Sequence, residues 1–195
     1  KIKHLGIEPA SSVAELGVKE GVNTITEFFS HELAKKIQTR YGRANVVFGA
    51  NVVAHIPDIR AVASGIVELL KDEGVFIFEA VYLGDLISNT SYSQIYDEHV
   101  FLFSALSVSY LANMHDLELV NVEPQITHGG SMRYTIAHKG VKKVSQNVIR
   151  LIKKEKKIGL DNKHAYANFT NNIDKIKDAL IELLSKLKND RKKVV

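Results

Sequence analysis

The chain has 195 residues, which is enough for one domain with a hydrophobic core and a short appendage but cramped for two full domains. Hydrophobic residues make up 45% of it and charged residues 25%, and no apolar run reaches the ~20 residues of a membrane span, so we expect no membrane partner. The absence of cysteine excludes disulfides and thiolate zinc sites within the chain and suits a cytoplasmic location.

The net charge is +4 at pH 7, and much of the excess lies in pairs of basic residues after residue 141. Basic side chains on a helix are usually solvated, and neither interleaved aromatic residues nor a nucleic-acid-binding motif accompanies these. We therefore expect no nucleic-acid partner. A polyanionic small molecule would tolerate the same charge.

Short apolar runs alternate with helical patterns in the first 80 residues. The runs that predict strands are residues 4–8, 23–29, 45–50 and 74–79, and the patterns that predict helices are residues 11–20, 31–41 and 59–71. Asp58 marks the start of the last helix and Gly74 follows its final turn. This alternation predicts an α/β fold with a doubly wound parallel sheet.

The pattern changes after Glu79. Residues 80–99 read as irregular, residues 104–114 as a helix, and residues 117–124 and 132–138 as an antiparallel hairpin at the sheet edge. Residues 142–189 read as helical, with an apolar stripe made of Ile173, Ile176, Leu180, Leu183 and Leu187. Residues 192–195 predict the start of another buried strand.

Three motifs carry residues that could do chemistry. Residues 92–99 read Tyr-Ser-Gln-Ile-Tyr-Asp-Glu-His and place Tyr96, Glu98 and His99 within four positions. Asn51 to Asp58 lies upstream with His55 inside it, and His128-Gly-Gly-Ser-Met-Arg133 lies downstream. Taken singly, each has a plain structural alternative: a helix-entry histidine, a packed tyrosine, or a turn whose glycines permit positive φ.

Taken together and in this order, the motifs resemble those of the S-adenosylmethionine-dependent C-methyltransferases that act on nucleotide-linked keto-deoxysugars. The resemblance spans essentially all 195 residues but only the middle of the family's length. It implies a class I methyltransferase (Rossmann-like) fold, with a partial methyltransferase core at residues 1–140. Residues 141–195 would be a helical connection into a truncated C-terminal domain. It also implies that a zinc module, the first strand and its glycine-rich loop precede Lys1, so that this chain is an internal piece of doubtful activity alone.

The resemblance implies S-adenosylmethionine as the cofactor. An acid that ends a parallel strand can accept hydrogen bonds from a ribose diol, and Glu8 is placed for this role. The adenine side would lie around Phe28 and Phe29, and Asn51 would lie beside the amino acid portion. Without the resemblance, Glu8 reads as a loop charge and the two phenylalanines as core residues.

The resemblance also implies a carbon–carbon bond-forming methyl transfer, which needs an enolate next to a ketone. His55, Tyr96, Glu98 and His99 match the residues associated with catalysis. His99 is the preferred base, because imidazole titrates near neutral pH and a neighbouring carboxylate can orient it. Tyr96 would donate a hydrogen bond to the enolate oxygen. His128 and Arg133 would lie near the substrate diphosphate or sugar.

Alternatives stay open at this point. A methyltransferase that acts on oxygen or nitrogen of a small molecule would need no enolate, and a non-catalytic binding module could dock a partner through the tail from Lys142. His55, Glu98 and His99 are legitimate metal ligands by type, but their spacing does not single out a metal. The sequence does not identify the sugar or the oligomeric state, and a homo-oligomer is compatible with it.

Overall fold

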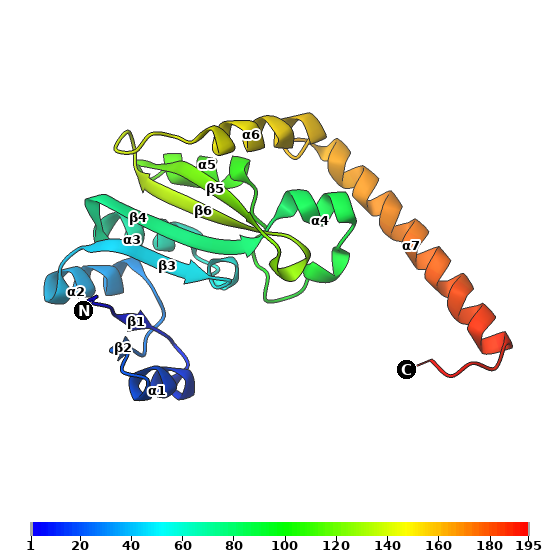
Figure 1. Ribbon diagram of the computed structural model, residues 1–195, viewed down its shortest axis with the longest axis horizontal. Helices are drawn as coiled ribbons and strands as arrows, with labels where there is room; N and C mark the ends of the chain where they lie inside the picture. The colour runs from blue at the N-terminus through cyan, green and yellow to red at the C-terminus, as the bar shows by residue number, and fades with distance from the viewer. Residues whose placement is uncertain (1, 195) are drawn as a thin grey trace.

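The structure is a computed structural model that describes residues 2–194, in which short strands and helices alternate through the first half of the chain (Figure 1). The elements are β1 (Gly6–Ile7), α1 (Ser11–Lys19), β2 (Thr24–Ile25), α2 (His31–Tyr41), β3 (Ala44–Ala50), the 3₁₀ turn η1 (Val53–His55), α3 (Ile59–Leu69), β4 (Leu70–Val81), α4 (Leu83–Asn89), η2 (Tyr92–Gln94), α5 (Ala105–Asn113), β5 (Leu117–Gln125), η3 (Thr127–Gly129), β6 (Ser131–His138), α6 (Gln146–Ile158) and α7 (Lys163–Asn189).

The strands form two sheets. β1 and β2 pair in parallel, and a four-stranded sheet has the order β3-β4-β6-β5. Within it β3 and β4 are parallel, whereas β6 is antiparallel to both of its neighbours. The predicted antiparallel pair at the sheet edge is confirmed. The continuous sheet expected from the alternation is instead divided between β1 and β3, which share no ladder of hydrogen bonds.

The core lies between the four-stranded sheet and the helices α3 and α5. Alternate residues of β4 face this layer because side chains along a strand point to opposite faces. Phe78 stacks on Tyr134 of β6 with ring centroids 4.9 Å apart and meets Phe103 edge-on at 5.3 Å. Val62 and Ile66 of α3 close the layer from the helix side. Burying each such side chain contributes about 1.5–3 kcal/mol, so this cluster fixes the end of β4.

Side chains mark where the helices begin. The hydroxyl of Ser30 accepts a hydrogen bond from the Leu33 amide at the start of α2, and the carboxylate of Asp58 accepts one from the Ala61 amide at the start of α3. The prediction that Gly74 follows the last turn of α3 is wrong. The helix ends at Leu69, and the chain enters β4 at once because Leu70 pairs with Ala44 of β3.

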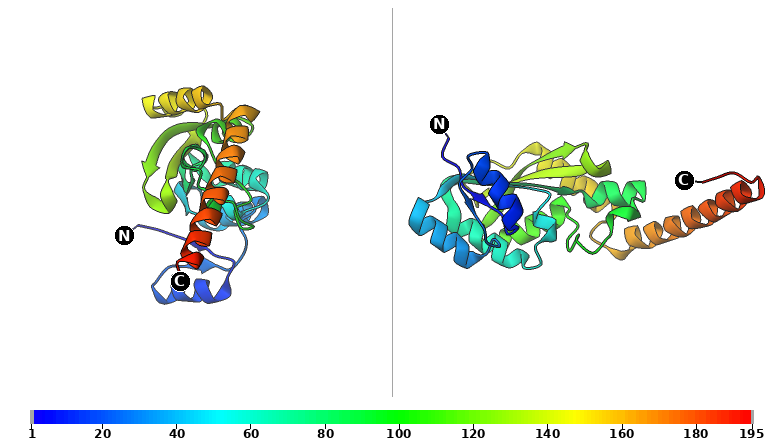
Figure 2. Two further views of the ribbon diagram at one scale, coloured as in Figure 1. Left: turned by 90° about the vertical axis from the view of Figure 1, so that its right-hand side faces the viewer. Right: turned by 90° about the horizontal axis from the view of Figure 1, so that it is seen from below.

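The C-terminal helices differ in how they contact the rest of the molecule. α6 packs against β5 and α5, whereas α7 runs away from the sheet and carries the chain far from the other elements (Figures 1 and 2). Near its start, Phe169 is buried against Leu86 of α4. Further along, Ile176, Leu180 and Leu183 of the predicted apolar stripe are exposed. The strand expected at residues 192–195 is not formed at residues 192–194, and Val195 lies outside the described residues.

Candidate active site

The candidate site is formed by η1, by α4 and by the loop that follows α4, at the point where β3 and β4 end. η1 follows β3, α4 follows β4, and residues 90–103 form a loop from α4 to α5. This loop returns to the sheet because the Phe101 amide donates to the Ala54 carbonyl and the Leu83 amide donates to the Phe103 carbonyl. The carboxyl ends of parallel strands are where α/β folds bind ligands, so the loop lies at the expected edge.

Tyr96 and His99 contact each other within the loop. The Tyr96 hydroxyl lies 3.1 Å from Nε2 of His99, and the two rings have centroids 4.2 Å apart. Nδ1 of His99 lies 2.7 Å from the Gln94 carbonyl oxygen. A carbonyl only accepts hydrogen bonds, so Nδ1 carries the proton and the neutral ring has its lone pair at Nε2. The phenol therefore donates to a nitrogen that is able to take a proton.

His55 enters the same cluster from η1. Its Nδ1 lies 2.7 Å from the Glu98 carbonyl oxygen, and its ring centroid is 5.1 Å from that of His99. The structure thus brings together three of the four predicted catalytic side chains. The fourth, the carboxylate of Glu98, is exposed and makes no hydrogen bond to His99 within the described part of the chain. The orienting acceptor of His99 is a backbone carbonyl instead.

The residues expected to hold the cofactor lie at the ends of three strands. Glu8 follows β1, and its carboxylate accepts a hydrogen bond from the Ala10 amide at 2.8 Å. Phe28 follows β2 and is 80% exposed, whereas Phe29 packs into the core against Gly65. Asn51 follows β3 with a φ of 53°, in the left-handed region that asparagine tolerates better than most residues. Phe29 is therefore a packing residue, and Phe28 is the accessible ring of the pair.

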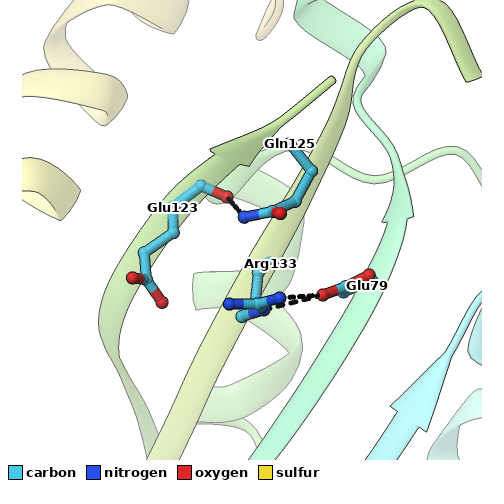
Figure 3. A network of polar contacts seen from close by, with 4 residues as sticks. All are labelled: Glu79, Glu123, Gln125 and Arg133. Carbon is cyan, nitrogen blue, oxygen red and sulfur yellow. Dashed lines mark hydrogen bonds and ion pairs between the residues drawn. The ribbon is translucent and has the colours of Figure 1, made fainter. Parts of the chain in front are cut away.

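Arg133 is engaged by a carboxylate rather than pointing freely outward. Its Nε and Nη2 lie 2.7 and 2.6 Å from Oε1 of Glu79, which faces it across the β4–β6 pair (Figure 3). Glu123 occupies the matching position on β5, on the other side of β6. His128 is exposed at a φ of 55° in the turn before β6. The structure therefore places these two predicted substrate residues near the end of β4 and the start of β6, without joining them to the Tyr96–His99 pair.

A buried carboxylate lies where the loop enters α5. Glu155 of α6 accepts hydrogen bonds from the Ala105 and Leu106 amides, both at 2.8 Å, and is fully buried. Burial raises the pKa of the Glu155 carboxyl, and the two amides oppose that rise. The spacing of Glu155 from Val148 and Leu151 places it on the inner face of α6. In the sequence Glu155 lies among four lysines, so it is easily taken for a solvent-exposed residue.

No helix within residues 2–194 has the length and apolarity needed to cross a bilayer. Over the same residues, no three histidine or carboxylate side chains gather in a way that could hold a metal ion. The functional groups that the sequence did not reveal are backbone atoms, above all the Gln94 carbonyl, and these leave no residue-type signal. Glu79 did have one, since it ends a predicted strand.

Sequence comparison finds two matches, and both are to C-methyltransferases. Residues 126–195 match the family model described as C-methyltransferase C-terminal domain. The chain is 32% identical over 191 residues to the C-methyltransferase NovU of Streptomyces niveus, in a match that covers 97% of this chain and 46% of that protein. The chain thus spans about half the length of the curated relative that it matches.

Solved structures agree on the fold. A SAM-dependent methyltransferase from Anabaena variabilis has a TM-score of 0.52 at 17% identity, over 69% of this chain and 68% of its own. The magnesium protoporphyrin IX methyltransferase of Synechocystis, solved with bound SAH, has a TM-score of 0.51 at 11% identity, over 69% and 64%. These likenesses show a class I methyltransferase fold. The two sequence matches are both to C-methyltransferases, one over residues 126–195 of this chain and the other over about half of the relative's length.

Proposed function

We propose that the whole protein transfers a methyl group from S-adenosylmethionine to the carbon next to the ketone of a nucleotide-linked 4-keto-deoxysugar. The family and its C-methylating relative support carbon as the acceptor. The observation that carries the proposal is the Tyr96–His99 pair, in which a phenol donates to an unprotonated imidazole nitrogen. Methylation of oxygen or nitrogen needs no enolate, so it gives the Tyr96 hydroxyl no enolate oxygen to stabilise.

The pair is suited to making an enolate. Nε2 of His99 would take the α-proton, the electron pair of the broken C–H bond would move into the enolate, and the Tyr96 hydroxyl would donate to its oxygen. A donor placed at such an oxygen contributes about 3–4 kcal/mol to the transition state. In the free protein the hydroxyl donates to Nε2 itself, so a bound ketone would draw the phenol to its oxygen and leave the nitrogen lone pair facing the α-carbon.

Residues at the strand ends fit the cofactor on its nucleoside side. The Glu8 carboxylate follows β1, where it could accept hydrogen bonds from a ribose diol, and Phe28, three residues after β2, offers an exposed ring. Asn51, at the end of β3, is the residue we assign to the amino acid portion. When bound, S-adenosylmethionine supplies an electrophilic methyl group that the enolate carbon takes up.

We further propose that residues 1–140 form the methyltransferase core and that residues 141–195 connect it to a C-terminal domain. The packing of α6 on β5 and the departure of α7 from the sheet support this division. The family match to a C-terminal domain begins earlier, at residue 126, so it includes β6, which is a strand of the core sheet. The strand β6 therefore belongs to the core sheet in the structure and to the C-terminal domain in the family match.

The test is deuterium exchange into the substrate in D₂O, measured by NMR on the full-length protein with a 4-keto-deoxysugar nucleotide and S-adenosylhomocysteine. Exchange at the α-carbon that is lost in His99→Asn supports the proposal. No exchange in this experiment, together with methyl transfer from S-adenosylmethionine that His99→Asn leaves fully active in a separate assay, would favour an oxygen or nitrogen acceptor.

Calorimetric titration with S-adenosylhomocysteine separates an enzyme from a binding module. We expect binding to be weakened by Glu8→Gln and unchanged by Glu20→Gln, which alters an exposed carboxylate at the end of α1. No binding to the full-length protein would favour a scaffold role. That role would then show as partner binding that is lost when residues 142–195 are deleted.

A further inference from the structure

Residues 92–100 are joined by hydrogen bond to the described part of the chain outside the 90–103 loop through one side chain. Their own hydrogen bonds are internal: the His99 amide donates to the Tyr96 carbonyl, the Val100 amide to the Glu98 carbonyl, and the His99 ring to Gln94. Within residues 2–194, the hydrogen bond that reaches this segment from outside the 90–103 loop comes from Nδ1 of His55.

This hydrogen bond from His55 is made to the peptide group directly before His99. The acceptor is the Glu98 carbonyl, which belongs to the peptide group that joins Glu98 to His99. The half-buried ring of His55 also packs against the His99 ring at 5.1 Å. One imidazole therefore fixes both the backbone and the ring of the proposed base. His55 itself sits in η1, which is anchored by the buried side chains of Val53 and Ala54.

We propose that His55 is a positioning residue, whose Nδ1–H holds the peptide before His99 and whose Nε2 takes no proton in the reaction. This role rests on the proposed function only in naming His99 as the base; the tether itself is a property of the fold. Glu98 takes part through its main-chain carbonyl oxygen, so its carboxylate is not needed for this contact.

Asparagine and alanine separate the two possible roles of His55. Nδ2 of asparagine stands the same number of bonds from Cα as Nδ1 of histidine, so His55→Asn keeps a donor for the Glu98 carbonyl but removes the Nε2 position. His55→Ala removes both. A net hydrogen bond is worth about 1 kcal/mol, which corresponds to a roughly fivefold change in an opening equilibrium.

The first measurement is amide hydrogen exchange by NMR on the chain itself, which needs no substrate. We expect His55→Ala to speed exchange at His99 and Val100 at least about fivefold, with amides of β4 and β6 unchanged, and His55→Asn to restore protection. If exchange at His99 and Val100 is the same in His55→Ala as in the unaltered chain, the tether is overturned.

The second measurement is kcat and its pH profile for the full-length protein. We expect His55→Ala to lower kcat with little change in KM, and His55→Asn to recover most of it with the same pH profile. Restored protection together with kcat as low as in His55→Ala would overturn the role, because the imidazole would then act chemically. Full activity of His99→Asn would instead refute the proposed base and leave the exchange result standing.

Discussion

Glu79 and Arg133 face each other on neighbouring strands and form an ion pair with nitrogen–oxygen distances of 2.6 and 2.7 Å. The Glu79 side chain is 13% exposed and that of Arg133 is 37% exposed, so the pair is intermediate between a surface and a buried ion pair. An arginine held in this way is a weaker candidate for binding a diphosphate than a free one, because the ligand must compete with Glu79.

We expect Arg133→Met to destabilise the fold by about 1–3 kcal/mol, since it leaves a largely buried carboxylate without its partner. Glu79→Gln should cost less, because the more exposed guanidinium can turn to water. Urea unfolding of both single variants and the double variant gives their coupling energy. A coupling near zero, together with loss of substrate binding in Arg133→Met, would instead favour direct contact between Arg133 and the substrate.

The turn before β6 predicts a difference between two adjacent glycines. A Cβ on Gly130 would lie 2.6 Å from Oδ2 and 2.8 Å from Cβ of Asp85, at a φ of 129°. Gly129 also has a positive φ, but a Cβ there would meet nothing within 4 Å. Gly129→Ala should therefore cost only the backbone strain, about 1 kcal/mol, and Gly130→Ala clearly more. Equal unfolding midpoints for the two variants would contradict the contact with Asp85.

The Tyr96 hydroxyl predicts a change in turnover rather than in binding. In the proposed mechanism Tyr96→Phe removes the donor to the enolate oxygen, so kcat of the full-length enzyme should fall by roughly 10²–10³ with KM little changed. Tyr92→Phe is the matched control, since Tyr92 is an exposed tyrosine in the same loop. A Tyr96→Phe enzyme that keeps its kcat would mean that the phenol does not act on the oxygen.

Glu155 predicts how stability depends on pH. Because burial raises the pKa of its carboxyl in the folded chain above the ordinary value of 4.5, the folded chain binds more protons than the unfolded one. Its contribution is therefore fully present below about pH 4.5 and is lost as the pH rises through the folded value. Glu155→Gln leaves one of two amides without an acceptor and should cost about 1–3 kcal/mol.

The measurement is urea unfolding of the unaltered chain and of Glu155→Gln from pH 4 to pH 8. Groups other than Glu155 titrate in both chains, so the difference between the two curves isolates this carboxyl. We expect the advantage of the unaltered chain to shrink as the pH rises. A difference that grows with pH would mean that the amides outweigh burial and lower the folded pKa.

The sequence predicted the fold best where one local signal was strong. The α2 helix has the predicted bounds, residues 31–41, because Ser30 caps it and its apolar spacing agrees with the cap. α4 was missed in residues 80–99 because it has seven residues and its N-cap side chain makes no hydrogen bond. β4 begins at Leu70, four residues before the predicted start at residue 74. The helical pattern included Leu70, but this residue pairs with β3 instead.

The candidate site was predictable at the level of residue types and not at the level of contacts. The spacing of Tyr96 and His99 allowed the contact that the structure shows. Adjacency also predicted that the Glu98 carboxylate would orient His99, whereas the chain turns so that Gln94 supplies the acceptor. A backbone carbonyl is present at every position, so only the path of the chain reveals which one is used.

The contact between Glu155 and the start of α5 has a mechanical consequence. The Glu155 carboxylate on α6 accepts hydrogen bonds from the first two amides of α5, which follow the 90–103 loop, so a shift of α6 along its axis would pull on the start of α5. A turn at residues 159–162 joins α6 to α7, a 27-residue helix that leaves the body of the molecule. A displacement of α7 would therefore reach one end of the loop that carries Tyr96 and His99 through α6 and Glu155.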